Sequence, residues 1–239
     1  ELHLHSESIK NVTAPAILIA GCGTGQHSIE TASRFSNCHV TAVDLSLASL
    51  AYAQRKSNEL RFTNIDYLQA DILHLHQMGK EFDIIESSGV LHHMDQPMAG
   101  WRALVYLLKP GGVFIGTSLD GKSVFDILNK NQAIMEHEED TLLWKINKKY
   151  KESQFNDDET CLGYSIDVYM ESIGKTFTEY LVNYTYLESL LQQYNLKLKE
   201  LYSFTDMYVD LNKSEEVYGD ALNMSDKLKT YSFLNKCFV

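Results

Sequence analysis

Short apolar runs rich in β-branched residues alternate with segments of helical periodicity along the first half of the chain. The predicted strands are residues 16–20, 39–43, 65–70, 82–86 and 113–118. One predicted helix runs to about residue 35, the next begins at Ser46, and another covers residues 98–108. Alternation of strands with helices favours a mostly parallel sheet that has helices on both faces. The pattern therefore predicts an α/β architecture.

The second half of the chain is more polar. Acidic side chains gather at residues 138–140 and 157–159, within a polar stretch at about 131–162. We interpret this stretch as an insertion, either a solvated helix and loop or a segment that covers a substrate. Further strands are expected at residues 165–171 and 196–204, and a final edge strand at 232–239. The length fits one domain, which we predict to span residues 1–239.

A glycine-rich turn stands directly between the first strand and its helix, with the sequence Gly21-Cys22-Gly23-Thr24-Gly25. Glycine is required where the backbone turns tightly and a ligand approaches the main chain. The spacing differs from the Gly-x-Gly-x-x-Gly pattern that seats a pyrophosphate. No Walker lysine follows the turn, which argues against hydrolysis of a nucleoside triphosphate. The turn predicts a cofactor site of another kind.

Acidic side chains close the next three strands. Asp44 ends the second strand, where a carboxylate can accept hydrogen bonds from both hydroxyls of a ribose. Asp71 ends the third strand, placed to accept from an adenine amino group, with Ile72 against the ring. Glu86 ends the fourth. Because the carboxyl ends of parallel strands meet at one edge of a sheet, we expect these side chains and the turn to converge on one ligand.

The net charge of -11 is unevenly spread. Residues 1–119 carry 8 basic and 11 acidic side chains, whereas residues 120–239 carry 13 and 21, so the two parts have net charges of -3 and -8. A negative field repels a nucleic-acid backbone at long range. Any RNA partner would have to bind locally or with the help of a basic protein partner.

The four cysteines show neither a Cys-x-x-Cys pair nor the spacing of a zinc site; they are Cys22, Cys38, Cys161 and Cys237. We expect reduced thiols and no metal site. The apolar runs are too short to cross a bilayer, and the start of the sequence does not resemble a signal peptide. These features predict no membrane association and an intracellular, cytoplasmic location, and they leave the oligomeric state open.

As a set, the motifs resemble those of class I S-adenosylmethionine-dependent methyltransferases. The matching segments are residues 17–25, 43–44, 70–71, 82–85 and 108–112. The resemblance implies a Rossmann-like, mostly parallel sheet of seven strands whose last strand is antiparallel. It also implies S-adenosylmethionine as the cofactor. The expected cofactor-binding residues are Gly21, Cys22, Gly23, Gly25, Asp44, Leu45, Asp71, Ile72 and Glu86.

The two halves of the chain resemble different branches of this family. Residues 15–112 resemble bacterial methyltransferases often attached to tetratricopeptide repeats, through residues 25–30 and 89–94. Residues 111–239 resemble messenger RNA cap guanine-N7 methyltransferases, particularly viral ones. The matching segments there are residues 112–121, 173–182 and 232–239. The second likeness implies capped RNA or a guanine nucleotide as the methyl acceptor, and the change between the likenesses is typical of a mosaic or recombined sequence.

The cap resemblance implies that Glu179 reads the guanine edge, since its carboxylate can accept from guanine N1–H and the 2-amino group. Guanine N7 attacks through a lone pair, so holding the reactants in line supplies most of the acceleration. His92 and His93 follow the fourth strand, over the expected methyl position. We expect His92, His93 and Glu179 to be catalytic. The expected acceptor-binding residues are His92, His93, Leu119, Glu179, Tyr180 and Asn235.

Some positions depart from the cap family. A lysine expected to meet the methionine carboxylate is missing from residues 23–26, and Leu119 and His93 replace a proline and a tyrosine. Two alternatives therefore stay open. One is a methyltransferase that acts on a small molecule or a protein, with His92 or His93 as general base. The other is a non-catalytic methyltransferase-fold module of a capping complex.

Overall fold

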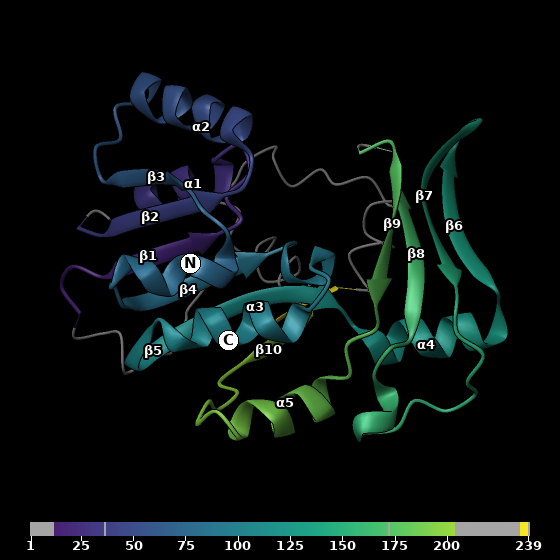
Figure 1. Ribbon diagram of the computed structural model, residues 1–239. Helices are drawn as coiled ribbons and strands as arrows, with labels where there is room; N and C mark the ends of the chain where they lie inside the picture. The colour runs from purple at the N-terminus through teal and green to yellow at the C-terminus, as the bar shows by residue number, and fades with distance from the viewer. Residues whose placement is uncertain (1–11, 36, 172, 204–234, 239) are drawn as a thin grey trace, which may run out of the picture. The chain divides into compact units, whose positions relative to one another are not determined.

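The computed structural model describes residues 12–35, 37–171, 173–203 and 235–238 (Figure 1). Contacts within the chain divide it into two compact units, one up to Gly116 and one from Thr117 onward. The two units are built differently: the first alternates strands with helices, whereas the second contains a four-stranded antiparallel sheet.

The first unit has the predicted alternation of strands and helices. Its elements are β1 (Ala16–Ala20), α1 (Gln26–Arg34), β2 (His39–Asp44), α2 (Leu47–Glu59), β3 (Ile65–Gln69), the 3-10 helix η1 (Ile72–Met78), β4 (Phe82–Ser88), the 3-10 helix η2 (Leu91–His93), α3 (Pro97–Tyr106) and β5 (Leu108–Leu119), which continues into the second unit. The strands lie in the order β5-β4-β1-β2-β3. The pairs β1/β2, β1/β4 and β2/β3 are parallel. The predicted Rossmann-like α/β fold is confirmed.

Alternate residues of the central strands face opposite sides of this sheet. The register places Ile17 of β1 beside Val40 of β2 and Ile84 of β4, so these side chains share a face. That face packs against α1 and α2 through Ala32 and Leu50. Residues on the other face of β1 are also buried. Burial on both faces explains why these strands are continuous apolar runs in the sequence.

The second unit contains a four-stranded antiparallel sheet, in the order β6-β7-β8-β9. Its elements are α4 (Gly121–Lys130), β6 (Ala133–Glu138), β7 (Thr141–Lys148), the 3-10 helix η3 (Glu159–Cys161), β8 (Ser165–Met170), β9 (Lys175–Tyr180), α5 (Tyr184–Gln192), β10 (Leu201–Ser203) and β11 (Asn235–Phe238). Buried side chains of α4, including Phe125 and Leu128, pack on Trp144 and Ile146 of the sheet. This sheet therefore has a core of its own.

Within the predicted polar insertion, the expectation of a solvated helix and loop is wrong for residues 133–148, which form the β6–β7 hairpin. In β7 the side chains of Trp144 and Ile146 are buried, whereas residues between and around them are partly exposed. The alternation of buried and exposed residues was hard to recognise in the sequence because β6 and the following turn carry acidic side chains. In that turn Glu139 has a φ of +52°. The prediction overlooked β9 as well.

The last two strands are paired antiparallel, and Leu201 of β10 lies opposite Phe238 of β11. Strand β10 is shorter than the predicted strand at 196–204. Part of the predicted final strand at 232–239 lies outside the described residues. The sheet of seven strands and the single domain stay predictions.

Candidate functional site

The turn between β1 and α1 is held in a conformation that favours glycine. Gly21, Gly23 and Gly25 have φ values of +83°, +52° and +84°, in the left-handed region. A Cβ at Gly21 would lie 2.2 Å from a methyl carbon of Val90, and one at Gly25 would lie 2.5 Å from Cβ of Ala53. A Cβ at Gly23 would meet open space. The turn is thus packed at its two ends and open in its middle, where a ligand can approach the backbone.

Asp44 links this turn to the end of β2. One carboxylate oxygen accepts from the backbone N–H of Gly23 at 2.8 Å, and the other accepts from the backbone N–H of Ser46 at 2.8 Å. The Asp44 side chain is therefore fixed beside the open part of the turn. Each carboxylate oxygen has two acceptor sites, so the side chain keeps capacity to accept from a ligand hydroxyl. The neighbouring Leu45 is exposed.

Asp71 lies at the end of the next strand and begins η1, where its carboxylate accepts from the backbone N–H of Leu73 at 2.9 Å. Ile72, which follows, is buried. Gln69 ties the two strand ends together, because its side-chain amide donates to the backbone oxygen of Leu45 at 3.0 Å. The predicted residues Asp44, Asp71 and Ile72 thus lie at the carboxyl ends of adjacent parallel strands, as the sequence predicted.

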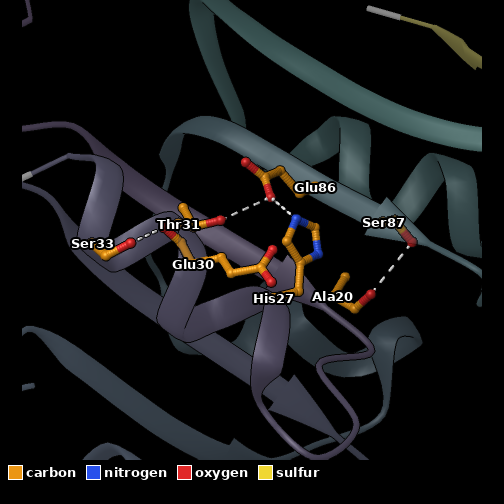
Figure 2. Close-up of polar contacts among 7 residues, drawn as sticks. All are labelled: Ala20, His27, Glu30, Thr31, Ser33, Glu86 and Ser87. Carbon is orange, nitrogen blue, oxygen red and sulfur yellow. Dashed lines mark hydrogen bonds and ion pairs between the residues drawn. The ribbon is translucent and has the colours of Figure 1, made fainter. Parts of the chain in front are cut away.

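Glu86 lies on β4 with 8% of its surface exposed. Its carboxylate accepts from the hydroxyl of Thr31 at 3.3 Å and contacts Nε2 of His27 at 2.6 Å (Figure 2). Both partners belong to α1. The hydrogen bond with Glu86 raises the pKa of His27, against the opposing effect of burial. His27 is absent from the predicted site residues, and its place two residues after Gly25 is the signal that was available.

Cys22 lies inside the turn but does not offer a nucleophile. Its side chain is buried, and burial together with the charge of Asp44 raises the pKa of the thiol to about 12. A thiol with such a pKa stays protonated near neutral pH, and the thiolate is the reactive form. In the described part of the chain, no group of three or more His, Cys, Asp or Glu side chains is placed to hold a metal ion.

The two candidate histidines follow β4 in the 3-10 helix η2. The backbone N–H of His93 donates to the carbonyl oxygen of Val90 at 3.0 Å, and Val90 also packs on Gly21 of the turn. This segment is therefore adjacent to the turn. Partial desolvation lowers the pKa of His93. The side chain of His92 lies outside the described residues.

The other predicted acceptor residues belong to the second unit. Leu119 is buried in its core. Glu179 lies on β9, directly opposite the buried Ile166 of β8, so its half-buried side chain shares the core-facing side of the sheet. Burial raises the pKa of Glu179 to about 7. Tyr180 is exposed, and Asn235 begins β11, with its side chain outside the described residues.

Part of the chain matches a known family. Residues 17–112, from β1 into β5, match a family described as "Methyltransferase domain". A crystal structure of an S-adenosylmethionine-dependent methyltransferase from Clostridium acetobutylicum has a TM-score of 0.57 with this chain and 17% identity, over 95% of this chain and 83% of that one. At this identity the likeness shows the fold, which is that of S-adenosylmethionine-dependent methyltransferases. The family and the fold imply S-adenosylmethionine as the cofactor, as the sequence predicted.

Two relatives are similar to part of the chain. An uncharacterized protein of a Synechococcus strain is 38% identical over 100 residues, 41% of this chain and 24% of that protein. Malonyl-[acyl-carrier protein] O-methyltransferase of Enterobacter lignolyticus is 33% identical over 120 residues, 50% of this chain and 45% of that enzyme. This chain thus spans less than half the length of either relative. Neither relative supports the predicted cap activity or a link to tetratricopeptide repeats.

Among the described residues, no helix has the length and apolar content that crossing a bilayer would require.

Proposed function

We propose that this chain is an S-adenosylmethionine-dependent methyltransferase whose cofactor binds at the carboxyl edge of the first unit's sheet. The observation that carries the proposal is the turn at Gly23, which is open to a ligand and hydrogen-bonded to the carboxylate of Asp44. An open backbone turn beside a fixed carboxylate suits a nucleoside, whose hydroxyls donate to the carboxylate while its body lies along the turn.

The residues of the first unit fit this cofactor. Asp44 would accept from the ribose hydroxyls, and Asp71 and Ile72 would bind the adenine. Helix α1 begins without a side-chain cap and without an acidic residue in its first turn, so its amino end favours a negatively charged group. The cofactor, when bound, supplies an electrophilic methyl group on a sulfonium. The protein's contribution is to orient the acceptor in line with that methyl group and to exclude water.

The first candidate acceptor is a small molecule or a group carried on a protein. It is supported by the similarity to a methyltransferase that acts on malonyl-[acyl-carrier protein], and by a net charge of -11, which disfavours a nucleic-acid acceptor. His93 provides the base that a hydroxyl or amine acceptor would need. Its lowered pKa keeps the imidazole neutral near pH 7, the form that accepts a proton.

The second candidate acceptor is guanine N7 of an RNA cap. The observation in its favour is Glu179, a half-buried carboxyl group on the core-facing side of β9. Because burial raises the pKa of Glu179 to about 7, its carboxylate form prevails above that pH, and guanine offers two adjacent donors to a carboxylate. Because of the acidic field, this candidate also requires local binding or a basic protein partner.

A radiolabelled methyl-transfer assay tests both candidates on the full chain. The substrates are capped RNA, GTP, malonyl-acyl carrier protein and a panel of small alcohols, amines and carboxylic acids. Transfer to capped RNA or GTP alone would establish the second candidate and exclude the first; transfer to the others would do the reverse. Tight binding of S-adenosylhomocysteine without transfer to any substrate would favour a non-catalytic module. Absence of S-adenosylhomocysteine binding in calorimetry would refute the proposed function itself.

A further inference from the structure

A histidine–carboxylate pair lies beside the glycine-rich turn and joins Glu86, a predicted cofactor-binding residue, to His27, which was not predicted. Nε2 of His27 is 2.6 Å from the carboxylate of Glu86, and the hydroxyl of Thr31 donates to the same oxygen at 3.3 Å. In Figure 2 the ring of His27 lies between Glu86 and Ala20, near the ends of β1 and β4. The pair is therefore at the carboxyl edge of the sheet.

The register of the sheet explains why Glu86 needs a positively charged partner. Ile19 of β1 lies opposite Glu86 of β4, so the carboxylate is on the face that packs against α1, among apolar side chains. A buried carboxylate is costly unless it is hydrogen-bonded and paired with a positive charge. Thr31 supplies a hydrogen bond, and His27 is the group able to supply the charge.

His27 also has an exposed part that its pairing with Glu86 does not use. Its side chain is 45% exposed, whereas that of Glu86 is 10% exposed. The imidazolium has two N–H donors, and the contact with Glu86 occupies Nε2. Nδ1 is on the other side of the ring, toward Ala20 and Ser87 in Figure 2. The half-exposed ring thus keeps one N–H donor that does not contact Glu86.

His27 is the basic residue of α1 that follows the turn directly, whereas Arg34 lies in the last turn of the helix. Between Ala16 and Ser33, His27 is the only residue that can carry a positive charge. The turn and the first residue of α1, residues 23–26, contain no lysine or arginine. A cofactor with a methionine part brings a carboxylate to the turn, and such a group is bound most strongly by a charged hydrogen-bond donor.

We infer that His27, paired with the buried carboxylate of Glu86, is the cation that binds the carboxylate of the cofactor's methionine part. The inference rests on the proposed function and deepens it. Glu86 acts as a positioning residue: it holds the imidazole ring at the strand end and stabilises its charge. His27 makes the contact with the cofactor.

Calorimetric titration of the full chain with two ligands tests this contact. S-Adenosylhomocysteine carries the amino-acid carboxylate, whereas 5′-methylthioadenosine has the same nucleoside and sulfur without it. The substitution His27→Gln should weaken S-adenosylhomocysteine binding about tenfold to a hundredfold, the range for a hydrogen bond to a charged group. Binding of methylthioadenosine should change less than about twofold. His27→Lys, which keeps a positive charge, should recover part of the lost affinity.

His39→Gln is the matched control, because His39 is also half-exposed and lies 2.8 Å from a carboxylate, that of Asp66, at the opposite edge of the sheet. It should leave both affinities unchanged. If His27→Gln lowers the affinity for both ligands equally, or lowers neither affinity, the inference is overturned while the proposed function stands. If the unsubstituted chain does not bind S-adenosylhomocysteine, the proposed function fails and the inference fails with it.

Discussion

The two units place their polar residues in different ways. In the first, Asp44 and Asp71 lie at strand ends, and backbone N–H groups hold both carboxylates. In the second, Glu179 lies within an edge strand, opposite an apolar residue, and is half-buried. Side chains at parallel strand ends can be predicted from the order of elements alone. A side chain within an antiparallel sheet depends on register, which a shift of one residue would reverse.

The comparisons with known proteins follow the same division. The family match covers residues 17–112, which contain every predicted cofactor-binding residue. Leu119, Glu179, Tyr180 and Asn235, by contrast, lie beyond the matched range. The sequence similarity of the first unit therefore supports the cofactor, whereas of the predicted acceptor-binding residues only His92 and His93 lie within the matched range. Substitutions in each unit separate cofactor binding from the choice of acceptor.

The largest effect is expected from Glu179→Gln, if the acceptor is guanine. Loss of the charged acceptor for two guanine donors should reduce methylation of a GpppA-type substrate at least about a hundredfold. S-Adenosylhomocysteine affinity, measured by calorimetry, should not change. Asp167→Asn is the control. Asp167 lies on the neighbouring strand β8, next to the residue that is opposite Glu179, and pairs with Lys149 at 3.0 Å. Full activity of the Glu179 variant on this substrate would remove Glu179 from the acceptor site.

Asp44→Ala, in the first unit, should affect cofactor binding. Removing a carboxylate that accepts from ribose hydroxyls should weaken the binding of S-adenosylhomocysteine by about 1–3 kcal/mol. The substitution also frees the N–H of Gly23, which now donates to Asp44. Asp66→Ala, in the adjacent strand β3 but bonded to His39 instead of the turn, should have no effect on this affinity. Equal affinities for the Asp44 variant and the unsubstituted chain would refute the ribose assignment.

Gly23→Ala separates ligand approach from backbone strain. Gly23 and Gly79 both have positive φ values, +52° and +60°, and a Cβ at either would meet open space. Each alanine should therefore lower the free energy of unfolding by about 1–2 kcal/mol. Only Gly23→Ala should also weaken S-adenosylhomocysteine, because only Gly23 lies in the turn. Urea denaturation and calorimetry measure the two effects, and equal binding by both variants would mean that the ligand does not approach Gly23.

The smallest effect is the pH dependence of stability that His27 contributes. Its pKa is raised in the folded chain by Glu86, so the stabilisation is fully present below the unfolded-state pKa of about 6.5. It is lost as the pH rises through the higher folded-state pKa. The contribution should stay below about 1 kcal/mol, since the His27 ring is half-exposed. Urea denaturation above pH 6 should show this loss, and His27→Gln should abolish it.

Several features of the first unit could be read from residue order. The continuous apolar runs identified buried parallel strands, and Gly21, Gly23 and Gly25 occupy the positive-φ positions that the glycine spacing suggested. The pairing of Glu86 with His27 was not predicted. These residues are 59 apart in the sequence, and they meet because β1, β4 and α1 are layered with a particular register. No local pattern specifies such a contact.

In the second unit the sequence was less informative, for a physical reason. The hairpin of β6 and β7 carries acidic side chains on its exposed positions and at its turn, so its composition matches that of a solvated loop. The alternation of buried and exposed side chains in β7 is explained only by the tertiary structure, in which α4 packs on one face of the sheet. The same packing puts Glu179 on the core-facing side, which the isolated segment 173–182 does not indicate.

The amino-acid sequence by itself determined the α/β class, the glycine-rich turn and the acidic strand ends, because these depend on hydrophobic period and on backbone conformations open mainly to glycine. The tertiary structure decided which distant side chains meet: Glu86 with His27, and Glu179 with the core of its sheet. Such contacts depend on strand register and on how helices pack on the sheet. Both bring together residues far apart in the chain, so the local sequence around each residue does not predict the contact.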